Sequence, residues 1–159
     1  MTKLNKIIYF VISLIFFIAF DRYFSDLILN DIRFKVSENK ILSLIFVQNT
    51  GAAFNILEDY KIFLIFFAIL AIFVISSYVF RHLEKFSTIS VLWASMLLAG
   101  IGCNMYERMV FGYVRDFFKL NFIDFPVFNI SDIFINVGVI AIIVIILKNK
   151  YIKTNEADN

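Results

Sequence analysis

The segment from Ile62 to Phe80 is the feature that most limits how this chain can fold, because its 19 residues include no charged side chain. At 1.5 Å per residue, a helix of that length is about 28 Å long, close to the roughly 30 Å of a bilayer's hydrocarbon core. The chain has 159 residues, of which 61% are hydrophobic and 21 are phenylalanine. A soluble domain of this size has too small an interior for so much apolar material, so we predict an integral membrane protein.

Three further segments have the composition of membrane spans, which gives four predicted spans at about 4–20, 62–80, 87–103 and 132–148. The first resembles a signal peptide, but FDRYFSD follows it and offers no small residues for cleavage, so we interpret it as a retained span. We expect a mainly α fold with four transmembrane helices. No linker or repeat is visible, and we treat residues 1–159 as a single integral-membrane domain.

Positive charges predict the orientation of these spans. They gather at three chain segments that four spans would bring to one face, at Lys3, Lys6, Arg81, Lys85, Lys148, Lys150 and Lys153. Lysine and arginine are enriched on the cytoplasmic side of membrane proteins. We therefore predict cytoplasmic termini and two external loops, at 21–61 and 104–131. The alternating pattern of DIRFKVSENKILSLIFVQN predicts a small β-rich subdomain in the first of these loops, and Asn49-Thr50-Gly51 indicates a turn.

Composition also argues against several classes of function. The net charge of +2 is not gathered on one face, which argues against a nucleic-acid partner. Cys103 is the sole cysteine and His82 the sole histidine, so the sequence offers no internal disulfide, no zinc motif and no sign of a metal or cofactor. The predicted topology places His82 on the opposite side of the membrane from Cys103. This excludes a thiol protease, because the thiol has no base to activate it.

Two acids, Asp116 and Asp132, bracket the segment DFFKLNFIDFPVFNISD at the start of the last span. Acids at the edge of a membrane span are costly, so they indicate a functional site. However, Asp132 follows Asn129 and Ser131 at a predicted helix start, where an aspartate is also a common cap. The pattern alone supports both interpretations equally.

The surrounding motifs favour catalysis. In chain order they are Asp21 at the end of the first span, QNTGAAF at 48–54, NMYERMVFGYVRDF at 104–117 and FPVFNISDIFINVG at 125–138. Together they closely resemble lipoprotein signal peptidase, the type II signal peptidase of bacteria, over essentially the whole chain. That family's V-x-D-F motif matches residues 114–117, and its F-P-x-F-N-x-A-D motif matches residues 125–132.

The resemblance implies an aspartic endopeptidase of the bacterial cytoplasmic (inner) membrane, with Asp116 and Asp132 as the catalytic pair at the external face. It implies that the enzyme removes the signal peptide from lipid-modified prolipoproteins by cleaving before the diacylglyceryl-modified cysteine. The substrate-binding residues would be Asn49, Gly51, Asn104 and Asn129. Structural support would come from Asp21, Glu107 and Arg108. Membrane lipids are implied partners, and globomycin-type cyclic peptides are implied inhibitors.

The chain departs from the family pattern at several positions near the site. Glu107 stands where the family has aspartate in N-x-x-D-R, and we predict that it forms an ion pair with Arg108. Near Asp21 the family shows glutamine followed by a lysine, and this chain has Arg22 and Ser25 at those places. Cys103 and Ser131 replace a glycine and an alanine.

Two close carboxylates cannot both stay ionised near neutral pH, so they share a proton. Because Asp132 should lie at a helix N-terminus, which favours an anion, we expect Asp116 to hold that proton. A small proton- or cation-coupled transporter that uses the edge aspartates is the alternative function, but it predicts charges near the middle of the spans. A structural subunit is a third possibility, in which the acids are caps.

Overall fold

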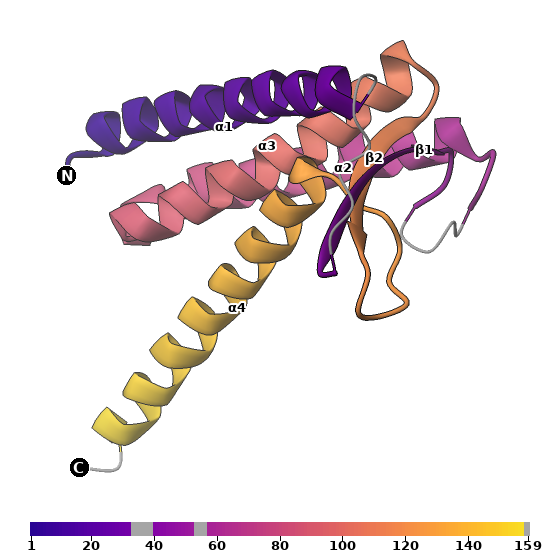
Figure 1. The fold of residues 1–159 in the computed structure, drawn as a ribbon. Coiled ribbons are helices and arrows are strands. Elements are labelled where there is room, and N and C mark those ends of the chain that lie inside the picture. The colour runs from indigo at the N-terminus through magenta and orange to yellow at the C-terminus, as the bar shows by residue number, and fades with distance from the viewer. Residues whose placement is uncertain (33–39, 53–56, 158–159) are drawn as a thin grey trace.

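The computed structural model describes residues 1–32, 40–52 and 57–157. In chain order its elements are α1 (Lys3–Ile32), β1 (Leu42–Asn49), α2 (Lys61–His82), the short 3₁₀ helix η2 (Leu83–Lys85), α3 (Thr88–Val110), β2 (Val114–Leu120) and α4 (Ile130–Ala157). The strands lie together at one end of the helices (Figure 1). The start of α1 and the end of α4 both lie away from the strands (Figure 1).

Within the described residues, four helices are long and apolar enough to cross a membrane, at Lys3–Asn30, Lys61–Lys85, Thr88–Val110 and Ile130–Lys148. Together with the small sheet they confirm the predicted fold class. Helix α3 is central, since 56% of its span is buried and it packs against the other three helices. Only 6% of the α2 span is buried, as expected for a helix that faces lipid.

Glycines allow α3 and α4 to pack closely. A Cβ atom on Gly100 would lie 2.6 Å from the backbone oxygen of Ser131, and one on Gly138 would lie 2.9 Å from the Cβ of Leu97. Small residues at such contacts let membrane helices approach through their backbones. The contact at Gly100 matters for the site, because it fixes α3 against the first turn of α4.

The sheet has two antiparallel strands, β1 and β2, and its register pairs Val47 with Asp116 and Asn49 with Val114. We predicted the β-structure in the first long loop alone, but β2 belongs to the second loop, so this part of the prediction is corrected. A lone strand leaves its backbone groups unpaired, and a partner was therefore required. The sheet joins the two loops on which the predicted site residues lie.

Two helices extend into the segments that we predicted as external loops. Helix α1 continues through Asp21 to Ile32, and α3 continues through Asn104 to Val110. The prediction ended the first span before Asp21 and the third before Asn104, where polar residues begin. The charged side chains in these extensions are instead accommodated by partners on neighbouring elements, as described below.

Two buried apolar clusters hold the elements together. The cluster remote from the sheet joins α1, α2, η2 and α3 and comprises Phe10, Val79, Leu83, Val91, Ala94 and Leu98. The cluster near the sheet joins α1, α3, β2 and α4 and comprises Leu29, Met96, Phe117, Ile130 and Phe134. Phe117 is fully buried, so it fixes β2 against the helices directly beside Asp116.

The N-terminal end of α1 is tied to the turn between α2 and α3. Lys6 Nζ donates hydrogen bonds to the backbone oxygens of Leu83, Glu84 and Phe86, at 3.2, 2.9 and 2.6 Å. Two of the three positively charged segments therefore lie together. The cytoplasmic location of this end stays a prediction.

Candidate active site

Asp132 lies in the first turn of α4 and makes a reciprocal cap with Asn129. The backbone N–H of Asp132 donates to Asn129 Oδ1 at 2.9 Å, and the backbone N–H of Asn129 donates to Asp132 Oδ2 at 3.1 Å. This is the capping-box arrangement, so Asp132 takes part in the cap of α4, and this role leaves its second oxygen available to other partners. Its second oxygen, Oδ1, accepts a 2.8 Å bond from Asn104 Nδ2 on α3.

Asp116 lies in β2 and is 1% exposed. Its Oδ2 accepts a 2.9 Å hydrogen bond from Asn49 Nδ2, and its Oδ1 accepts one of 2.8 Å from Asn129 Nδ2. The strand register explains the first bond, because Asn49 is two residues from Val47, the partner of Asp116, and so lies diagonally across the same face. Asn49 Oδ1 also accepts from the backbone N–H of Gly51 at 2.9 Å.

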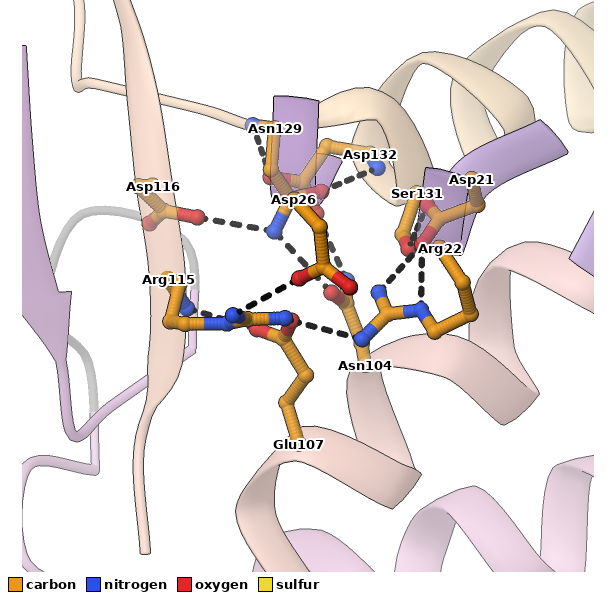
Figure 2. A network of polar contacts seen from close by, with 10 residues as sticks. All are labelled: Asp21, Arg22, Asp26, Asn104, Glu107, Arg115, Asp116, Asn129, Ser131 and Asp132. Atoms are coloured by element: carbon orange, nitrogen blue, oxygen red, sulfur yellow. Dashed lines mark hydrogen bonds and ion pairs between the residues drawn. The ribbon is translucent and has the colours of Figure 1, made fainter. Parts of the chain in front are cut away.

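A chain of hydrogen bonds links the two carboxylates (Figure 2). It runs from Asp116 to Asn129, continues through a 3.1 Å bond from Asn129 Nδ2 to Asn104 Oδ1, and ends with the bond from Asn104 to Asp132. Asn104 and Asn129 are 8% and 3% exposed. The structure therefore brings together both predicted acids and three predicted asparagines, which come from β1, α3, β2 and the start of α4.

Both carboxylates line one open cleft of about 840 Å³. Its other lining residues are Ile45, Val47, Asn49, Ala52, Asn104, Arg108, Val114, Lys119, Asp124, Phe125, Pro126, Val127, Phe128, Ile135 and Asn136. The wall is mixed, with apolar side chains from β1 and from the segment before α4. A cleft of this kind can hold an extended peptide with its backbone near two acids.

The pKa of the Asp116 carboxyl is raised to about 7, first by burial and then by the negative charge of Asp132. Hydrogen bonds from Asn49 and Asn129 and the positive charge of Arg108 oppose this shift. Asp116 is thus poised to carry a proton near neutral pH, in line with the expectation from the sequence. Raised pKa values at a cleft are typical of functional sites, although structural networks also produce them.

The predicted ion pair between Glu107 and Arg108 is corrected, because the two side chains leave α3 in different directions and bind other partners. Arg108 Nη2 donates to the backbone oxygen of Gly51 at 2.6 Å, and Nη1 donates to that of Asn104 at 3.3 Å. Arg108 therefore ties the segment after β1 to α3, beside the cleft.

Glu107 is 2% exposed and faces the other way, toward Arg22 and Arg115. Figure 2 shows these residues beside Asp116 and Asp132, together with Asp21 and Ser131. Sequence reasoning assigned no role to Arg115, because no periodic pattern links a strand residue to an acid on a preceding helix. Alternation in β2 was the available signal: it turns Arg115 to the face opposite Asp116.

The sequence profile of the family described as signal peptidase (SPase) II matches residues 13–148. The chain belongs to the signal peptidase II family. A member of this family is a protease, which disfavours the transporter alternative. With its four apolar helices, this signal peptidase II is a multi-pass membrane protein.

Curated relatives of this signal peptidase II align with it over as much as nine-tenths of its length. Over 151 residues it is 34% identical to the lipoprotein signal peptidase of Streptococcus pyogenes (strain Manfredo), covering 89% of this chain and 94% of the relative. Over 111 residues it is 39% identical to that of Streptococcus pneumoniae (strain R6), covering 69% and 71%. The relative from Lactobacillus johnsonii is 33% identical over 152 residues, covering 92% and 96%.

Two solved structures of bacterial membrane enzymes have the same fold. Each is 28% identical to this signal peptidase II. The first has a TM-score of 0.78, and the match covers 89% of this chain and 88% of the chain in that structure. The second has a TM-score of 0.74 and covers 87% and 92%.

Proposed function

We propose that this signal peptidase II is an aspartic endopeptidase, with Asp116 and Asp132 as its catalytic pair. The observation that carries the proposal is the chain of hydrogen bonds through Asn129 and Asn104, which joins the buried carboxylate of Asp116 to the half-buried carboxylate of Asp132 at one open cleft. Peptide hydrolysis by two acids needs one ionised and one protonated group. The raised pKa of Asp116 suits it to the protonated role.

In the proposed reaction, Asp132 takes a proton from a water molecule whose oxygen attacks the scissile carbonyl carbon. Asp116 gives its proton to the carbonyl oxygen, so the tetrahedral intermediate is neutral. The C–N bond then breaks as Asp132 passes its proton to the leaving nitrogen and Asp116 recovers one from a hydroxyl of the intermediate. Both acids return to their starting states.

We assign substrate binding to Asn49, Gly51, Asn104 and Asn129. Asn49 and Asn129 hold Asp116, and Asn104 holds Asp132, so these amides fix the two acids, and Asn49 and Asn104 also line the cleft. Gly51 offers no side chain that would block a peptide backbone, and Arg108 fixes its carbonyl. Asp21, Glu107 and Arg108 support this arrangement.

The proposed substrate is a prolipoprotein whose cysteine carries a diacylglyceryl group, cut just before that cysteine. A soluble peptide would lose conformational freedom on binding with little to offset the loss. Each buried methylene contributes about 0.8 kcal/mol, so two acyl chains keep the precursor in the bilayer. Anchoring also fixes the depth of the scissile bond, which turns a three-dimensional encounter into one in the membrane plane.

The site would face the outside of the bacterial cytoplasmic (inner) membrane, and membrane lipids would surround α2. Cyclic peptides of the globomycin type would inhibit the enzyme by occupying the cleft. No metal or cofactor has a part in the proposal.

The test compares diacylglyceryl-modified and unmodified precursor, at equal concentration in vesicles that hold the purified enzyme. We expect rapid cleavage of the modified precursor and little of the unmodified one. Addition of a globomycin-type peptide should stop the reaction. Equal rates for the two precursors would contradict the proposed substrate class.

A further inference from the structure

A second buried polar cluster lies beside the dyad (Figure 2). We call it the ionic bridge and define it as Asp21, Arg22, Glu107 and Arg115. Asp21 and Glu107 are 0% and 2% exposed. Buried carboxylates are costly to keep unless they are paired and hydrogen-bonded. The proposed reaction uses neither, so their retention needs its own explanation.

On one side, the ionic bridge holds the strand that carries Asp116. Glu107 Oε2 accepts a 2.7 Å hydrogen bond from the backbone N–H of Arg115, and Glu107 Oε1 accepts one of 2.8 Å from Arg115 Nε. Arg115 Nη1 also pairs with Asp26 on α1 at 3.1 Å. Arg115 directly precedes Asp116. Its backbone hydrogen bond to Glu107 on α3 therefore fixes the position of β2 relative to α3 next to Asp116.

On the other side, the ionic bridge holds the helix turn that carries Asp132. Ser131 Oγ donates a 2.5 Å hydrogen bond to Asp21 Oδ2 on α1, and Ser131 is fully buried. Ser131 directly precedes Asp132. Each catalytic acid thus has a neighbour in the chain that is bonded to a buried carboxylate of the bridge.

Arg22 joins these two sides. Its guanidinium donates to Asp21 Oδ1 through Nε at 2.9 Å and through Nη2, and its Nη1 donates to Glu107 Oε1 at 2.7 Å. Its Cζ atom also lies 5.7 Å from the centre of the Tyr106 ring. The planar guanidinium can bind two carboxylates at once in a fixed geometry, which a lysine ammonium does less well.

We propose that Arg22 is a positioning residue, which sets the separation of Asp116 and Asp132 by joining Asp21 to Glu107. The inference rests on the proposed aspartic mechanism. Arg22 contacts both carboxylates directly, through its 2.7 Å ion pair with Glu107 and its ion pair with Asp21.

The test measures kcat and KM on lipid-modified precursor for purified Arg22→Gln. Misplacing reacting groups by about 1 Å can cost about 100-fold in rate, so we expect kcat to fall by about 10- to 100-fold. KM should change little, because Arg22 does not line the cleft. Arg81→Gln is the matched control, since Arg81 is exposed on α2 and its removal should leave both constants unchanged.

A double-mutant cycle separates positioning from general destabilisation. If Arg22 acts through Glu107, then Arg22→Gln in a Glu107→Gln background should lower kcat little further. The inference would be overturned if the loss of kcat in the double variant equalled the product of the losses in the two single variants. A wild-type kcat for Arg22→Gln would also overturn it. If Arg22→Gln does not accumulate, Arg22→Lys takes its place, with an expected kcat loss of about three- to tenfold. A wild-type kcat for Arg22→Lys would then overturn it.

Two reference proteins distinguish this inference from the proposed function. If the wild type does not cleave the precursor, or if Asp116→Asn cleaves it normally, the proposed function fails. If the wild type cleaves, Asp116→Asn does not, and Arg22→Gln matches the wild type, only the inference about Arg22 fails.

Discussion

The side-chain amide of Asn129 donates a 2.8 Å hydrogen bond to Asp116, although Asn129 directly precedes α4 and Asp116 lies in β2. The backbone N–H of Asn129 donates at the same time to Asp132. Among the described residues, Asn129 alone donates hydrogen bonds to both carboxylates, by way of two different groups. The cap of α4 is therefore also the link between the two proposed catalytic acids.

The first prediction follows from this link. Asn129→Ala removes the cap, which typically costs about 1 kcal/mol of stability, and leaves Asp116 Oδ1 without its donor. We expect a kcat lower by about 10- to 100-fold, since an acid is misplaced. Asn121→Ala is the matched control, because the amide of Asn121 bonds Ser43 and not the dyad. Similar kcat values for the two variants would contradict the assigned role.

The second prediction concerns pH. The pKa of Asp116 is about 7 in the folded protein, against an ordinary value of 3.8. Between these values the folded state binds more protons than the unfolded state, so the contribution of Asp116 to stability falls as pH rises. Asp116→Asn removes this titration. The Tm of Asp116→Asn minus the Tm of the wild type should therefore increase from pH 5 to pH 8. The same difference should not increase for Glu58→Gln, a control at an exposed residue. A constant difference in Tm would contradict the raised pKa.

The third prediction uses two glycines of α3 that differ in their surroundings. A Cβ on Gly100 would meet the backbone oxygen of Ser131 at 2.6 Å, whereas one on Gly102 would meet nothing within 4 Å. Overpacking costs about 1–3 kcal/mol, so Gly100→Ala should lower both stability and kcat. Gly102→Ala should be neutral or slightly stabilising, because alanine favours helix. Thermal unfolding and kcat check both, and equal effects would refute the close contact.

The fourth prediction concerns topology. A reporter that is active only outside the cytoplasm should be active when fused after Glu58 or Lys119. It should be silent after Lys85 or Lys150. Lys119 lies in β2, which also carries Asp116, so this fusion reports the side of the site directly. The opposite pattern would place the cleft in the cytoplasm and contradict processing of exported precursors.

Hydropathy predicted the four helices. The motifs predicted that Asp116, Asp132 and the three asparagines belong to one site. The lengths of α1 and α3 were missed, because their last turns carry charges that only partners on other elements accommodate. The pairing of Glu107 was missed for a related reason. Arg108 is its neighbour in sequence, but Arg22 and Arg115 are its partners in space. The second strand was missed because VRDFFKL was interpreted as a motif and not as a strand.

Asp116→Asn and Asp132→Asn test the central claim most directly, since asparagine keeps the size of the side chain and removes the acid. The measurement is cleavage of diacylglyceryl-modified precursor by each purified variant, at matched amounts of folded protein in vesicles. The dyad mechanism predicts that both variants fold, remain in the membrane and release no detectable signal peptide. Substantial cleavage by either variant would contradict it.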